Sequence, residues 1–123
     1  MNIIKTDKAP KAIGPYSQAI MTNNMLFVSG QLGLNPSTME LPESILDQAY
    51  QSFTNIGEIL KEAGMSYDDV VKTTVFITDI SKFSAVNEVY ATFFKGNPAR
   101  SCVEVSKLPK GALIECEVIA VKR

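Results

Sequence analysis

The fold is decided by residues 44–64, SILDQAYQSFTNIGEILKEAG, and by residues 70–80, VVKTTVFITDI, which follow closely. In the first stretch, apolar residues recur at steps of three and four, which is typical of an amphipathic helix over Ser44–Ala63. Ser44 and Asp47 predict a capping box at its start, and Gly64 fits the position just beyond its C-cap. The second stretch is rich in Val, Ile and Thr and predicts a strand half buried in a sheet.

The flanking sequence predicts four more strands and a second amphipathic helix. Asn23 and Asn24 favour a hairpin turn between the first two strands, and Ser81 fits the N-cap of the second helix. The expected elements are strands over Tyr16–Met21 and Met25–Ser29, a helix over Ser81–Phe94, and strands over Ala99–Ser106 and Ala112–Val121. No repeat or linker interrupts this order, so we expect residues 1–123 to form one α+β domain.

One face of the predicted sheet needs a partner. Two helices can cover only one face, yet the strand at residues 70–80 carries apolar or β-branched residues on both alternations. Val75 and Ile77 lie on one alternation, and Thr74 and Phe76 lie on the other. We therefore expect self-association to bury the second face.

Composition excludes several function classes. The 123 residues are 46% hydrophobic and 20% charged, which is typical of a globular protein. A net charge of -1 gives no basic surface for nucleic acid, and the absence of His excludes Ser-His-Asp and Cys-His catalytic pairs. The charged N-terminus lacks an apolar signal region, and no apolar run could span a membrane. We expect a cytoplasmic protein.

Two cysteines, Cys102 and Cys116, lack a CxxC spacing. In a reducing compartment they are best interpreted as small buried hydrophobes rather than as a disulfide. Two sulfurs cannot fill a tetrahedral metal site, so no metal is expected.

Arg100 begins an apolar strand in the stretch PARSCV at residues 98–103. A planar guanidinium can bind a carboxylate through two parallel hydrogen bonds, which a lysine cannot reproduce. The alternative is a structural ion pair with Glu104, Glu115 or Glu117, and the residues alone leave both interpretations open.

Glu115 lies in the apolar stretch ALIECEVIAV at residues 112–121, and alternation places Glu117 on the same face. Apolar surroundings raise a carboxyl pKa toward the range of a general base. The alternative is that both glutamates line a solvated edge. Tyr16 and Ser29 lie at expected strand ends, where loops commonly build sites, although each is a weak signal by itself.

Several stretches together resemble the RidA family, also called YjgF or endoribonuclease L-PSP. They are IGPYSQA at 13–19, VSGQ at 28–31, VKTTVF at 71–76 and PARSCVEV at 98–105, with LP at 108–109 and IE at 114–115. The short connection Lys95–Asn97 and Cys116 depart from the family pattern. The resemblance implies a chorismate-mutase-like α+β fold, in which a six-stranded mixed sheet carries two helices on one face and three copies form a homotrimer.

The resemblance also implies an activity, the hydrolysis of reactive enamines and imines such as 2-aminoacrylate to 2-keto acids and ammonia, without a cofactor. It implies clefts between subunits, in which Arg100 holds the substrate carboxylate, Glu115 activates water and Tyr16 assists. The remaining implied substrate-binding residues are Ser29, Gly30, Asn87 and Cys102, the last through its backbone. Two alternatives are a single-stranded RNA endoribonuclease or translation inhibitor, and a non-catalytic regulatory protein that binds keto acids.

Overall fold

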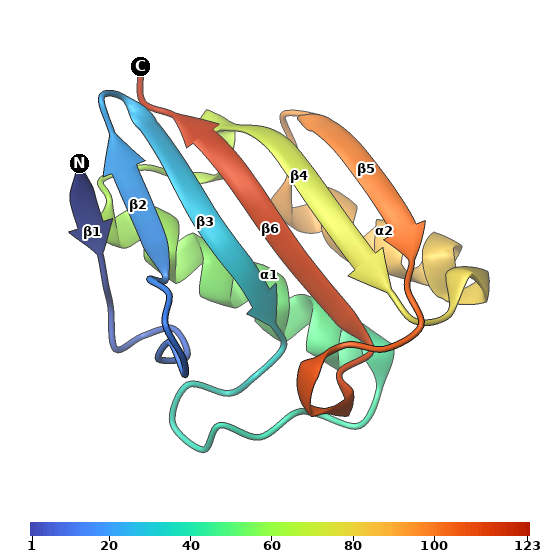
Figure 1. Ribbon diagram of the computed structural model, residues 1–123. Coiled ribbons are helices and arrows are strands. Elements are labelled where there is room, and N and C mark those ends of the chain that lie inside the picture. The colour runs from blue at the N-terminus through green and yellow to red at the C-terminus, as the bar shows by residue number, and fades with distance from the viewer.

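The computed structural model describes residues 1–123, in which one six-stranded sheet is backed by two α-helices (Figure 1). The strands lie in the order β1-β2-β3-β6-β4-β5. Only β4 and β5 are parallel, so the sheet is mixed and the predicted α+β class is confirmed. The elements are β1 (Asn2–Ile4), β2 (Ala19–Thr22), β3 (Met25–Leu32), α1 (Ile45–Glu62), β4 (Val70–Ile77), α2 (Phe83–Phe93), β5 (Ala99–Glu104) and β6 (Ile114–Val121).

Both helices cover the same face of the sheet (Figure 1). α1 packs on β3 and β6 and against α2. A cluster of 22 buried residues fills the space between helices and sheet, with Phe53, Leu60 and Ile114 fully buried. Neither helix is long and apolar enough to cross a membrane.

Helix α1 begins and ends where the sequence predicts. The hydroxyl of Ser44 accepts a hydrogen bond from the backbone N–H of Asp47 at 3.1 Å. Gly64 follows the C-cap Ala63 with a φ of 74°, which glycine adopts at little cost. The Asp47 side chain makes no return bond to the backbone of Ser44, so the predicted capping box is a simple N-cap.

The second helix begins at Phe83 rather than at Ser81. The Asp79 side chain accepts bonds from the N–H and hydroxyl of Ser81 at 3.0 and 2.6 Å. It thereby caps a short 3-10 turn, Ile80–Lys82, that precedes α2. The same turn ends β4 at Ile77, three residues before the predicted end.

Other predicted boundaries also shift. β3 continues to Leu32, whereas β2 starts at Ala19. The last two strands are each two residues shorter than predicted, β5 ending at Glu104 and β6 starting at Ile114. The residue pattern did not indicate the edge strand β1, whose three residues are held by pairing with β2.

Buried polar side chains of α1 bind the end of β3. The hydroxyl of Ser52 donates to the carbonyl of Gln31 at 2.7 Å. The amide of Asn55 donates to the carbonyls of Leu32 and Leu34 at 3.2 and 2.9 Å. These bonds supply partners to backbone carbonyls where β3 leaves the sheet. They fix the direction in which the chain enters its next loop.

The face of the sheet opposite the helices is not covered by this chain. In β4, Val75 and Ile77 are buried beneath the helices, whereas Phe76 on the other alternation is half-buried. Phe27 of β3 and Val103 of β5 are exposed on this open face, by 41% and 44%. The prediction that this face carries apolar side chains is confirmed.

We expect Asn55→Leu to lower the melting temperature by roughly 5 °C or more, since it removes the donor to two carbonyls and each unmet buried group costs about 1–3 kcal/mol. Thr54→Val is the matched control, because the Thr54 hydroxyl bonds only the Tyr50 carbonyl of the same helix, at 2.7 Å. Thermal unfolding of both variants by circular dichroism tests the difference. Equal melting temperatures would contradict the role of Asn55.

Candidate active site

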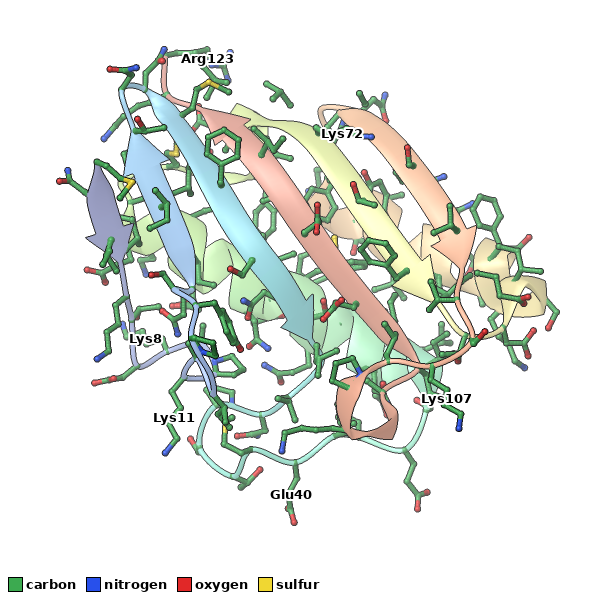
Figure 2. The ribbon with its side chains drawn as sticks, in the orientation of Figure 1. Lys8, Lys11, Glu40, Lys72, Lys107 and Arg123 are labelled. Atoms are coloured by element: carbon green, nitrogen blue, oxygen red, sulfur yellow. The ribbon has the colours of Figure 1, made fainter.

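A pocket of about 580 Å³ opens at one end of the sheet. It is lined by the end of β3, the start of β6 and loop residues between 10 and 18, between 34 and 39, and at 109–110. Figure 2 shows the labelled Lys11, Glu40 and Lys107 on three loops that gather at this end. Four of the predicted site residues line the pocket: Tyr16, Ser29, Gly30 and Glu115.

The Glu115 carboxylate lies against the backbone of Gly30. A Cβ at position 30 would come within 2.7 Å of Glu115 Cδ and 3.0 Å of Oε2. The β3–β6 ladder is interrupted between Val28 and Gln31, so the backbone at Gly30 departs from regular pairing. Such irregularities redirect side chains and are frequent beside active sites. Gly30 therefore creates the space that the Glu115 carboxylate occupies.

Glu115 is half-buried, and its carboxylate receives no hydrogen bond or ion pair from this chain. Burial is the main cause that raises the pKa of its carboxyl, and the charge of Glu117 adds to the effect. β6 lies between β3 and β4, so the alternative of a solvated sheet edge is wrong for Glu115. A half-buried carboxylate with free lone pairs can take a proton from a bound water.

Ser29 and Tyr16 flank this carboxylate pocket. The hydroxyl of Ser29 donates to the Ser17 carbonyl at 2.6 Å, so its oxygen has lone pairs left for a ligand. Tyr16 is 52% exposed, and its hydroxyl accepts a bond from the N–H of Ile13 at 3.4 Å. Tyr16 lies in a loop before β2 rather than in the predicted strand.

Gln18 is a pocket residue that sequence reasoning missed. It is 4% exposed, accepts a bond from the N–H of Thr6 and donates to the Pro10 carbonyl, both at 2.8 Å. These bonds hold the N-terminal loop against the sheet. The only sequence feature that could have indicated Gln18 is its position directly before β2. Residue type alone does not distinguish a buried amide from an exposed one.

Two lysines, Lys11 and Lys110, also line the pocket. Lys110 is exposed and lies in the loop between β5 and β6. It has a φ of 60°, in the left-handed region, which places this residue at a sharp bend before β6.

Arg100, Asn87 and Tyr90 form a second group at the β5 edge. Arg100 Nη1 donates to Asn87 Oδ1 at 2.7 Å. The guanidinium carbon lies 4.7 Å from the ring centre of Tyr90 and 5.3 Å from that of Phe83. Arg100 makes no ion pair within the chain, so the structural ion-pair interpretation is wrong here. Glu104 instead accepts a bond from the N–H of Ile80 at 2.8 Å.

The two thiols are free and poorly suited to act as nucleophiles. Cys116 is fully buried and Cys102 is partly buried. Burial raises the pKa of both thiols, which keeps them protonated. The prediction of small buried hydrophobes is confirmed for Cys116. No group of three His, Cys, Asp or Glu side chains in the chain is placed to hold a metal ion.

The two groups of predicted residues lie far apart within one chain. Arg100 pairs with Thr73, which is fully buried beneath the helices, so Arg100 projects on the helix side. Glu115 precedes the fully buried Cys116 and therefore projects from the open face. β5 is also three strands from β3, roughly 14 Å at the usual strand spacing. The structure thus brings Tyr16, Ser29, Gly30 and Glu115 together at one pocket. It does not bring Arg100, Asn87 or Cys102 to that pocket.

Comparison with known proteins gives a consistent family. The family model described as Endoribonuclease L-PSP matches residues 6–122. A RutC family protein of Pasteurella multocida is 53% identical, with 98% of this chain and 97% of that protein covered. The rat protein named 2-iminobutanoate/2-iminopropanoate deaminase is 51% identical over 98% of this chain and 89% of its own length.

A solved structure has nearly the same fold. The crystal structure of E. coli TdcF with bound serine superimposes with a TM-score of 0.97. The two chains are 46% identical, and the match covers 100% of both.

We expect Glu115→Gln to raise the melting temperature, relative to the unmodified protein, more at about pH 7.5 than at about pH 4. The folded pKa of Glu115 is raised above its usual value of 4.5, so its stabilising contribution is present below that value and lost as pH rises through the folded pKa. Gln does not titrate and avoids this loss. Thermal unfolding of both proteins at the two pH values measures the effect, and a pH-independent difference would contradict it.

Proposed function

We propose that this chain, which belongs to the endoribonuclease L-PSP (RidA) family, is a deaminase that hydrolyses small 2-imino acids to 2-keto acids and ammonia. The name of the rat relative, 2-iminobutanoate/2-iminopropanoate deaminase, supports the substrate class. The bound serine in E. coli TdcF is a small molecule with a carboxylate and a nitrogen on the same carbon, as in a 2-imino acid. Compounds of this class include 2-aminoacrylate, which reacts after it tautomerises to its imine.

One observation carries the proposal, the half-buried Glu115 carboxylate that lies against Gly30 without a partner from the chain. A structural glutamate in a sheet would be paired or hydrogen-bonded. This carboxylate instead faces an open pocket and has a raised pKa, which suits it to exchange a proton with water.

The reaction follows from these groups. Water adds to the C=N carbon, Glu115 takes a proton from that water, and the imine nitrogen takes up a proton from the Tyr16 hydroxyl as the π electrons move to it. The resulting carbinolamine collapses when its hydroxyl gives a proton back to the Tyr16 oxygen and the C–N bond breaks, with Glu115 passing its proton to the departing ammonia. The products are a 2-keto acid and ammonia. The imine carbon is already electrophilic, so no cofactor is needed.

The substrate carboxylate is held by Arg100 of a neighbouring subunit. Within one chain, Arg100 and Glu115 project from opposite faces and cannot meet on a small molecule. A neighbouring copy can bring its β5 edge to the pocket, where Arg100 offers the fork of N–H groups that Asn87 leaves free. Asn87 and the backbone of Cys102 come with it, so the complete site has two halves.

This arrangement needs an oligomer, for which we propose the homotrimer that the family resemblance implies. The uncovered sheet face, with Phe27 and Val103 exposed, supports burial between copies. In the shared site, Tyr16 borders the imine nitrogen and its hydroxyl can pass a proton to it. Ser29 offers lone pairs to the substrate, and Gly30 keeps the space beside Glu115 open.

A coupled assay tests the activity. A serine or threonine dehydratase generates the imine, and keto-acid formation is timed with and without this protein. Acceleration supports the deaminase. Keto-acid binding without acceleration would support a regulatory binding protein instead, and cleavage of single-stranded RNA without imine turnover would support a ribonuclease.

We expect Glu115→Gln to lower turnover by about 100- to 10,000-fold, because the amide lacks the basic oxygen while a general base contributes a factor of this size. Affinity for 2-ketobutyrate, measured by calorimetry, should change little, since Arg100 remains. Glu117→Gln is the matched control: Glu117 lies on the same face of β6 and borders the same pocket, but it is exposed and acts on Glu115 only through its charge, so its loss should change turnover far less. Equal turnover of the two variants would contradict the role of Glu115.

A further inference from the structure

Three residues, Thr73, Tyr90 and Arg100, form a stack at the β4–β5 side of the sheet. Thr73 lies on β4 and is fully buried, and its hydroxyl is 2.8 Å from the hydroxyl of Tyr90 on α2. The Tyr90 ring, 8% exposed, lies beneath the guanidinium of Arg100 at 4.7 Å. The stack therefore runs from a rigid strand through a helix to a side chain at the sheet edge.

Arg100 needs such support because it is exposed and its long side chain has many rotamers. The Asn87 amide oxygen fixes the position of one terminal nitrogen but not the plane of the guanidinium. An aromatic face attracts the cation and holds its plane parallel or tilted to the ring. With Phe83 at 5.3 Å on α2, two aromatic rings lie close to the guanidinium.

The hydroxyl of Tyr90 determines where its ring lies. A buried phenol needs a hydrogen-bond partner, and Thr73 supplies it from the strand that pairs with β5. Phe53 meets the ring edge-on at 5.8 Å, and Phe94 packs tilted to it at 4.6 Å. The ring is thus held by packing around it and by a polar contact at its tip.

We infer that Tyr90, anchored through its hydroxyl to Thr73, is a positioning residue that orients the guanidinium of Arg100 for two-point binding of a carboxylate. This inference rests on the proposed function, in which Arg100 holds the substrate carboxylate. Tyr90 acts through Arg100 and takes no part in the proton transfers at Glu115. Its loss should therefore weaken ground-state binding and leave the chemical step unchanged.

Tyr90→Leu tests the inference beside Phe94→Leu. Phe94 belongs to the same aromatic cluster and is 1% exposed, and Arg100 does not stack on its ring. Both variants should have a lower melting temperature than the unmodified protein. Tyr90→Leu alone should raise KM for the imine and Kd for 2-ketobutyrate by roughly tenfold, with kcat within about twofold, as expected for a lost cation–π contact that the neighbouring subunit shields from water in the proposed shared site.

Two conservative variants keep the test informative if Tyr90→Leu does not fold. Tyr90→Phe keeps the ring and removes the hydroxyl, and Thr73→Val removes the partner while keeping the volume of the side chain. Each should raise Kd for 2-ketobutyrate by about threefold, because the ring remains but loses one hydrogen bond. No change in Kd for either variant would overturn the role of the Thr73–Tyr90 contact.

Arg100→Lys separates the positioning role of Tyr90 from the proposed role of Arg100 in carboxylate binding. If it weakens 2-ketobutyrate binding and Tyr90→Leu adds no further loss in the double variant, Tyr90 acts through Arg100. If Arg100→Lys weakens binding but Tyr90→Leu does not, the positioning role is overturned and the proposed function stands. If Arg100→Lys leaves binding unchanged, the proposed carboxylate site fails, and the positioning role fails with it.

Discussion

The opposite orientation of Glu115 and Arg100 on one sheet is the constraint on which this account depends. Alternation along a strand allows a side chain only two directions, and β6 sends Glu115 to the open face while β5 sends Arg100 toward the helices. A molecule of a few atoms cannot bridge the two within one chain. The proposed chemistry therefore requires a second copy, and the apolar open face offers the surface on which copies can meet.

Each half of the proposed site is held by the layer of helices behind the sheet. On the β3 side, Ser52 and Asn55 of α1 bind carbonyls where the strand ends, which sets the loop that borders the pocket. On the β5 side, Asn87 and Tyr90 of α2 contact the guanidinium of Arg100. The helices thus stabilise the core through their apolar stripes and orient polar groups through the residues beside those stripes. This arrangement places rigid elements beneath both groups of functional side chains.

The sequence predicted the parts of the structure that depend on local periodicity. The cap at Ser44, the turn at Asn23 and the shared face of Glu115 and Glu117 follow from residue pattern, and the structure confirms all three. Features that depend on contacts distant in the sequence were not predictable in this way. The bond from Asn55 to Leu34 spans 21 residues and that from Gln18 to Thr6 spans 12, so no window of local sequence contains the reason for either polar side chain to be buried. The same limit explains why the sequence offered three glutamates as possible ion-pair partners of Arg100, whereas in the structure Arg100 bonds to Asn87.

The shared site is tested most directly by mixing two inactive variants. Arg100→Ala and Glu115→Gln chains are co-expressed in equal amounts, and the deaminase activity of the mixed oligomer is compared with that of each variant alone. In random trimers, about three quarters contain both kinds of chain, and each of these has one site of three with both groups intact, which predicts about a quarter of the unmodified activity. Activity no greater than that of the separate variants, with mixed oligomers demonstrated by native mass spectrometry, would contradict a site built from two subunits.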